Sequence, residues 1–197
     1  MGDRLLDVAQ ALFARQGYAG TSVSEIVAAA GVTQPMLYYY FANKQALFEA
    51  LFDRARASFQ AVLRQPFPAG RAARERLTDL CRRLVEEART APWRVRLLLM
   101  VWSGFAPDAP GRPGIETLLA DFQALIGTMV EEGVRQGEFV RVPALEIAWG
   151  VSALCIRAME EAVHDPAGSG PPPEVERLVG HFLAGITIFP NRFGNRA

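Results

Sequence analysis

The sequence predicts an all-α protein. Apolar residues recur at every third or fourth position over almost the whole chain of 197 residues, and no segment keeps the strict alternation that is typical of a half-buried strand. Half of the residues are hydrophobic, which is enough to bury a sizeable core. Glycine- and proline-rich stretches divide the periodic segments. We therefore expect about nine helices.

The first 31 residues predict two short helices. Apolar residues over 5–13 form one face of the first helix, which we expect to end at Gly17 because glycine adopts the left-handed conformation after a helix end. Ser22 is followed three residues later by Glu25, and this spacing is typical of a capping box at a helix start. The second helix is expected to end at Gly31.

The next segment predicts a brief third helix over 34–41, with Thr33 as its cap and Pro35 in its first turn, where a missing N–H costs little. Asn43 is a suitable cap for a long fourth helix. Loops are expected at 66–70, 105–114 and 165–173. The five remaining helices are expected over 71–90, 93–102, 115–137, 143–164 and 175–189.

The second and third helices, joined by a tight glycine turn, form a predicted helix-turn-helix. The third helix carries three tyrosines in succession, Tyr38 to Tyr40. Successive residues on a helix point about 100° apart, so these tyrosines cannot all face the core. Phenol hydroxyls donate to phosphate oxygens, and the Gln34 amide has the geometry to pair with adenine. Lys44, at the start of the fourth helix, is placed for a phosphate.

The run from Gly31 to Phe41, followed by Asn43 and Lys44, resembles the recognition-helix signature of the TetR family of bacterial transcriptional regulators. Close similarity covers residues 3–52. The resemblance implies a helix-turn-helix DNA-binding domain at 1–48 and a helical ligand-binding and dimerisation domain at 49–197. It also implies double-stranded operator DNA, a small-molecule effector and a second copy of the chain as partners.

By this resemblance Gln34, Pro35 and Met36 face base edges, and the tyrosines and Lys44 hold or approach the phosphate backbone. Ser24 stands where some members carry a base-reading arginine. Charges over residues 1–48 cancel, so binding is expected to depend on placed contacts more than on bulk charge. The candidate DNA-binding residues are Ser24, Thr33, Gln34, Pro35, Met36, Tyr38, Tyr39, Tyr40 and Lys44.

Large apolar side chains in the C-terminal part are candidates for an effector pocket, because members of the family enclose a ligand between helices. A pocket of roughly 300–1,000 Å³ lined by such residues favours an apolar or aromatic molecule. In most helical proteins the same side chains are ordinary core residues. The candidates are Trp93, Met100, Trp102, Phe122, Met129, Trp149 and Met159.

The helix over 143–164 is apolar on more than one face, and small residues at Gly150, Ser152 and Ala153 allow close approach. The last helix also has too many apolar positions for one buried stripe. Pairing of both helices with their symmetry mates in a four-helix bundle covers them. Arg157 is expected to pair with the glutamates three and four residues on, and the alternative is that it pairs with an anionic ligand.

The sequence favours a cytoplasmic regulator without a cofactor or metal. It has neither a signal peptide nor the uncharged apolar run of about 18 residues that a membrane span requires. Cys81 and Cys155 are interpreted as buried hydrophobes, and no catalytic constellation is apparent. The expected function is a repressor that binds a pseudo-palindromic operator as a dimer and is released by ligand. The alternatives are a ligand-independent architectural DNA-binding protein and a helical enzyme with an N-terminal interaction domain.

Overall fold

The computed structural model describes residues 1–102, 110–165 and 175–187, and within these ranges the chain is α-helical without a strand. The all-α prediction is confirmed. The helices are α1 (Gly2–Gln16), α2 (Val23–Ala30), α3 (Gln34–Tyr40), α4 (Lys44–Leu63), α5 (Ala73–Thr90), α6 (Pro92–Trp102), α7 (Arg112–Arg135), α8 (Ala144–His164) and α9 (Val175–Ala184).

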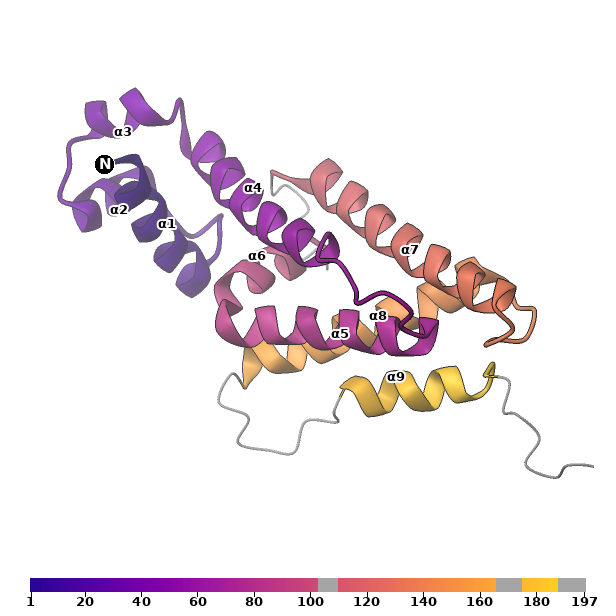
Figure 1. Ribbon diagram of the computed structural model, residues 1–197. Coiled ribbons are helices and arrows are strands. Elements are labelled where there is room, and N and C mark those ends of the chain that lie inside the picture. Colours follow the sequence, from indigo (N-terminus) through magenta and orange to yellow (C-terminus); the bar gives the residue numbers. More distant parts are fainter. Residues whose placement is uncertain (103–109, 166–174, 188–197) are drawn as a thin grey trace, which may run out of the picture.

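The helices form a small N-terminal unit and a larger body (Figure 1). Helices α1 to α3 lie together at one end of the molecule, and α4 runs from them into the body formed by α5 to α9. Within the body α8 packs against α7 and α5, and α9 packs against α5. The domain boundary expected after residue 48 falls inside α4, so the two units share one continuous helix.

Local signals set three of the first helix ends as predicted. The capping box at α2 is confirmed: Ser22 Oγ accepts from the N–H of Glu25, and the Glu25 carboxylate accepts from the N–H of Ser22. These hydrogen bonds lower the pKa of Glu25. Gly31 ends α2 with φ of 62°, a left-handed conformation that an L side chain rarely adopts. Asn43 Oδ1 caps α4 at 2.8 Å from the Ala46 nitrogen.

Thr33 is the N-cap residue of α3, as predicted. Its side chain makes no capping hydrogen bond, because Pro35 supplies no N–H and the N–H of Met36 donates to the Thr33 carbonyl instead. Helix α7 begins three residues earlier than expected, since Pro113 fits its first turn. Residues 105–109 of the predicted loop at 105–114 and residues 166–173 of the predicted loop at 165–173 lie outside the described residues. The expected end of the last helix at 189 is wrong: α9 ends at Ala184, because the chain turns there and the Ile186 carbonyl accepts a hydrogen bond from the N–H of Val140 instead.

Aromatic packing and ion pairs join α1 to α4. The ring of Phe48 lies 5.5 Å from that of Phe13 and 4.9 Å from that of Tyr18, edge to face in both pairs. On the surface Arg54 of α4 pairs with Asp3 and with Asp7 of α1. The N-terminal unit is therefore attached to the same helix that enters the body.

Predicted side-chain pairs and burial in the body are also confirmed. Arg157 pairs with Glu160 at 3.2 Å and with Glu161 at 3.1 Å. Cys81 and Cys155 are fully buried. Hydrogen bonding to Cys81 and burial raise the pKa of the Cys155 thiol, which keeps it protonated and disfavours its reaction as a thiolate.

Helix α5 receives its N-terminal cap from a distant residue. Ala72 precedes the helix and has no capping side chain. Glu138, in the turn between α7 and α8, accepts hydrogen bonds from the backbone N–H groups of Ala73 at 2.6 Å and Arg74 at 2.9 Å. A carboxylate at this place satisfies two free donors and complements the positive end of the helix dipole.

We expect Glu138→Ala to lower the free energy of unfolding by about 1–2 kcal/mol, because two charge-assisted hydrogen bonds at a helix start are lost. Urea unfolding followed by circular dichroism measures the change. The matched control is Glu131→Ala, an exposed glutamate on α7. Equal stability of the two variants would contradict a capping role for Glu138.

Candidate nucleic-acid interface and ligand cavities

One side of the short helix α3 packs against the rest of the N-terminal unit. Its Leu37 side chain is fully buried, while Phe41, the residue that follows the helix, packs against the core in part. The turn before it is closed by hydrogen bonds from the N–H groups of Gly31 and Val32 to carbonyls at the end of α2. The rest of α3 faces outward, as a helix that presents side chains to a partner must.

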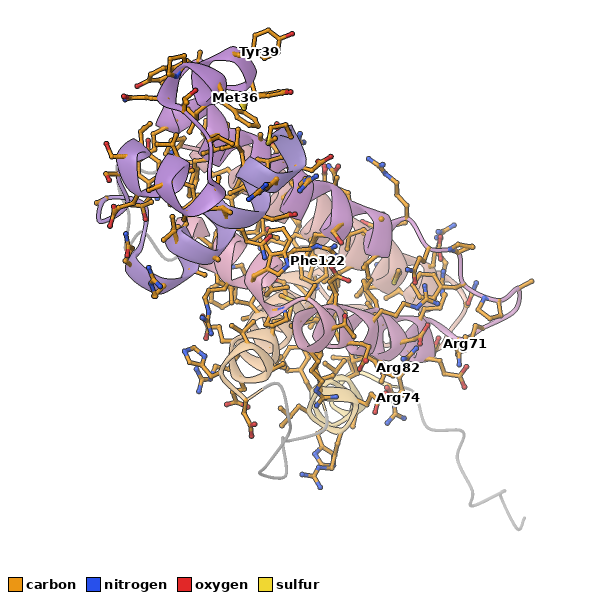
Figure 2. All side chains as sticks on the ribbon, turned by 90° about the vertical axis from the view of Figure 1, so that its left-hand side faces the viewer. Met36, Tyr39, Arg71, Arg74, Arg82 and Phe122 are labelled. Atoms are coloured by element: carbon orange, nitrogen blue, oxygen red, sulfur yellow. The ribbon has the colours of Figure 1, made fainter. Side chains whose placement is uncertain are left out.

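Side chains on this outward face lie at the tip of the molecule. Figure 2 shows Tyr39 and Met36 at one end, with Phe122 of the body well below them. Tyr39 is 82% exposed. Gln34 donates to the Tyr38 hydroxyl at 3.4 Å, and the Tyr40 ring lies beside Gly2. Of the nine candidates, eight are exposed: Ser24, Thr33, Gln34, Pro35, Met36, Tyr38, Tyr39 and Tyr40.

The Lys44 side chain makes its contacts within the protein. Its ammonium donates to the carbonyl oxygens of Tyr18 and Thr21, each at 2.9 Å, and lies 4.4 Å from the centre of the Tyr18 ring. Two of its three N–H donors therefore hold the turn between α1 and α2. A phosphate contact by Lys44 stays a prediction, and it would use the remaining donor.

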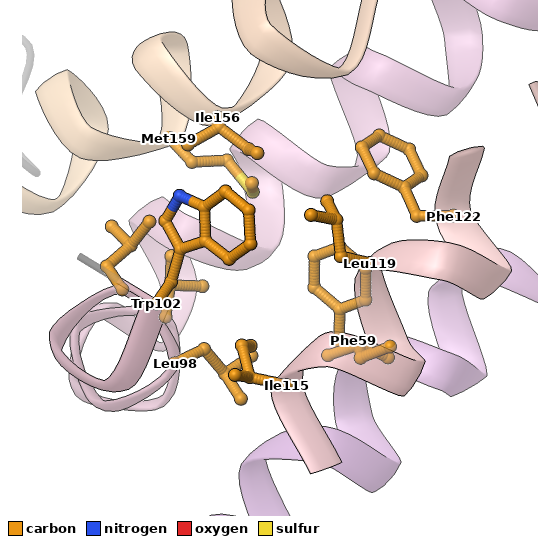
Figure 3. Close-up of a pocket in the computed structure, with 11 residues that line it drawn as sticks. Phe59, Leu98, Trp102, Ile115, Leu119, Phe122, Ile156 and Met159 are labelled. Atoms are coloured by element: carbon orange, nitrogen blue, oxygen red, sulfur yellow. The ribbon is translucent and has the colours of Figure 1, made fainter. Parts of the chain in front are cut away.

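A partly open apolar hollow, which we call the enclosed cavity because four helices surround it, lies between α4, α6, α7 and α8 (Figure 3). The Trp102 indole points into it, opposite Leu119. Its volume is about 40 Å³, so the expectation of roughly 300–1,000 Å³ is wrong for this conformation. Side chains from four helices occupy most of the space. The cavity is lined by Phe59, Val95, Leu98, Leu99, Trp102, Ile115, Leu118, Leu119, Phe122, Ile156 and Met159.

A second hollow, the α1–α6 crevice, lies where the N-terminal unit meets the body. Its volume is about 170 Å³. Leu51 of α4 also contributes to its wall, and two polar side chains face it among apolar ones. The crevice is lined by Gln10, Phe13, Ala14 and Gly17 of the α1 segment, Leu51, and Trp93, Arg96, Leu97 and Met100 of α6.

The seven residues expected to line one pocket are divided by the structure. Trp102, Phe122 and Met159 line the enclosed cavity, whereas Trp93 and Met100 line the crevice. Met129 is buried, and Trp149 is 69% exposed on α8. Neither of these two lies at either hollow. Helical spacing alone did not distinguish these positions, and it gave no reason to choose Phe59 or Leu119 over other apolar residues.

Exposed apolar side chains form a surface that we call the α8–α9 patch, made of Leu145, Trp149 and Ala153 of α8 and Phe182 of α9. The three α8 residues are four positions apart and therefore share one face. Phe182 packs on α8 beside Gly150, where an added Cβ would lie 2.5 Å from its ring. Gly150 thus makes room for α9 of the same chain. Ser152 is buried, and Ala153 alone of the three small residues is exposed.

The N-terminal unit matches a known family. Residues 5–51 match the family model described as bacterial regulatory proteins of the tetR family. Over almost the full length, the chain is 26% identical to the transcriptional regulator EthR of Mycolicibacterium smegmatis, covering 90% of this chain and 81% of EthR. The N-terminal unit therefore carries the tetR-family segment. Helices α2 and α3 are the helix-turn-helix of its DNA-binding domain.

Other TetR-family relatives match the N-terminal unit alone. The chain is 46% identical to the transcriptional repressor ComR of Escherichia coli over 52 residues, which are 26% of this chain and 25% of ComR. It is 45% identical to the regulator AcrR of Shigella flexneri over 49 residues, or 23% of AcrR. The match thus spans about a quarter of the length of each of these relatives.

Solved TetR-family structures share the fold over both units. A family member from Rhodococcus RHA1 superposes with a TM-score of 0.76 at 19% identity, covering 96% of this chain and 98% of the other. NalD, the secondary repressor of the MexAB-OprM multidrug efflux pump in Pseudomonas aeruginosa, superposes with a TM-score of 0.73 at 21% identity, covering 94% and 96%.

The described residues contain neither a membrane-spanning helix nor a cluster of metal ligands. Helices in the described ranges are too short or too polar to cross a membrane. In the same part of the chain, no three side chains among histidine, cysteine, aspartate and glutamate gather as a metal site requires.

We expect Lys44→Met to increase hydrogen exchange at residues 17–22 by about tenfold, because two carbonyl oxygens lose a charged donor while the apolar stem is retained. Native-state exchange read by mass spectrometry measures it, with Gln45→Met, an exposed neighbour, as the control. Unchanged exchange in the Lys44 variant would show that its ammonium does not hold the turn.

Proposed function

We propose that this protein is a transcriptional repressor that binds a pseudo-palindromic operator as a homodimer through α3. The observation that carries the proposal is the outward face of α3, where six side chains are exposed on a helix of seven residues. Amide and phenol groups there suit base edges and phosphates. Repression, rather than activation, is supported by ComR and NalD, which are named as repressors.

We propose that residues 1–48 bind DNA and that residues 49–197 bind effector and dimerise. The α8–α9 patch supports dimerisation, because exposed Trp149 and Leu145 on one helix face are rarely left in water. In a dimer with a two-fold axis through this patch, the patch of one subunit covers the same patch of the other. The same axis sets the distance between the two α3 helices, as a dimeric operator requires.

The enclosed cavity is the proposed effector site, and all eleven of its lining residues are apolar. At about 40 Å³ it is too small for an effector in this conformation. An apolar or aromatic ligand must therefore bind a conformation in which α6 or α7 has moved, and α6 packs against α1 and α4. Ligand binding would then favour a different placement of the DNA-binding unit.

The small cavity volume also favours a second candidate, a DNA-binding protein that has no effector and uses its body only to dimerise. Both candidates bind the same DNA. They differ in whether any apolar compound changes the affinity for that DNA, which a ligand screen with the selected operator decides.

We expect selection from a random duplex pool, at roughly 150 mM salt, to recover an inverted repeat. Gln34→Ala and Tyr39→Ala should each weaken binding to it by about tenfold or more, since each removes a base or phosphate contact. Fluorescence anisotropy with the labelled duplex measures the affinity.

The control for these variants is Gln65→Ala, an exposed glutamine beyond α4. Recovery of no consensus by a folded dimer would reject operator binding. Equal affinity of all three variants would reject the assigned face of α3.

We expect Trp149→Glu to raise the dimer dissociation constant at least about tenfold. The substitution places one negative charge from each subunit in an apolar two-fold interface. Sedimentation velocity measures the oligomeric state, and circular dichroism checks the fold. Tyr39→Glu, a charge at an exposed aromatic on α3, should leave the dimer intact. A Trp149 variant that dimerises like the parent would exclude the α8–α9 patch.

A further inference from the structure

We propose that the α1–α6 crevice is a second binding site, which takes a small aromatic carboxylate. It is separate from the enclosed cavity, and the lining residues of the two hollows do not overlap. The proposal concerns ligand binding alone and does not depend on DNA binding.

The walls of the crevice are two matching helix faces. On α1 and the Gly17 that follows it the lining positions are 10, 13, 14 and 17, and on α6 they are 93, 96, 97 and 100. Each set follows the spacing i, i+3, i+4, i+7, which places its members on one side of a helix. Two helices thus face each other across a gap that their side chains do not fill.

The size of the gap suits one aromatic ring. Its volume of about 170 Å³ is close to that of an engineered cavity of about 150 Å³ that binds benzene. Phe13 and Leu97 form buried parts of the wall, and the Trp93 ring is half-buried there. Aromatic and aliphatic carbon on several sides favours a flat apolar ligand.

The charge at the gap favours a carboxylate. Arg96 donates one hydrogen bond to the Val163 carbonyl, at 3.4 Å through Nη2. Within the described ranges no carboxylate forms an ion pair with Arg96, so its Nε and Nη1 donors can hold a ligand carboxylate. Gln10 also lines the crevice, and its amide offers a further donor. A cationic ligand is disfavoured by the guanidinium.

The crevice lies between the N-terminal unit and the body, so a bound ligand would contact both. A ligand held by α1 and α6 together stabilises the arrangement in which those helices keep their present separation. Its binding therefore opposes any movement that separates the N-terminal unit from α6.

The test is a fluorine NMR titration of the full chain with 4-fluorobenzoate, and with neutral 4-fluorobenzamide in parallel. We expect saturable 4-fluorobenzoate binding that Arg96→Gln weakens about tenfold or more, since a charge-assisted pair is lost. The amide should bind the parent and this variant equally. Ala14→Leu, which fills the crevice from α1, should abolish binding of both probes.

Two controls locate the site. Arg135→Gln removes an exposed arginine from the last turn of α7 and should leave binding unchanged. Leu119→Phe fills the enclosed cavity and should also leave it unchanged. The proposal would be overturned if 4-fluorobenzoate did not saturate the protein up to about 10 mM. It would also be overturned if both arginine variants lost binding equally, or if the Leu119 variant alone lost binding. A protein that binds no operator but binds 4-fluorobenzoate at Arg96 would still support it.

Discussion

Packing along α4 is the interaction on which the rest of the structure depends. Its N-terminal half carries Phe48 into the aromatic cluster of the DNA-binding unit. Its C-terminal half carries Phe59 to the wall of the enclosed cavity, edge to face with Phe122. Between them, Phe52 packs on Gly114 at the start of α7, where an added Cβ would lie 2.8 Å from its ring. One hydrogen-bonded helix is stiff over this length. This helix therefore connects the wall of the enclosed cavity to the N-terminal unit.

Helix α6 is the second shared element, and its two sides meet different hollows. Val95, Leu98 and Trp102 face the enclosed cavity, whereas Trp93, Arg96, Leu97 and Met100 face the crevice. This explains why apolar residues lie on more than one side of the helix. The proposed effector and the proposed carboxylate would therefore contact different sides of the same helix.

Several side chains have partners in the fold that the sequence did not indicate. Lys44 matched a phosphate-binding position, but its ammonium holds the carbonyls of the turn before α2. Trp149 was a pocket candidate and lies on the surface of α8. Gly150 was expected to admit a second copy and instead admits Phe182 of its own chain. In each case the sequence pattern identified a notable side chain, but the group that it contacts could not be predicted from neighbouring residues.

The sequence by itself determined the helices, the capping box at Ser22, the turn at Gly31, the cap at Asn43 and the exposure of the tyrosines on α3. These features depend on neighbours within a few residues, because backbone hydrogen bonding and helical periodicity are local. The tertiary structure alone decided the cap of α5 by Glu138, the division of the apolar residues between two hollows, and the pairing of α1 with α6. Contacts between residues far apart in the chain leave no periodic signal, because an apolar face looks the same whatever covers it.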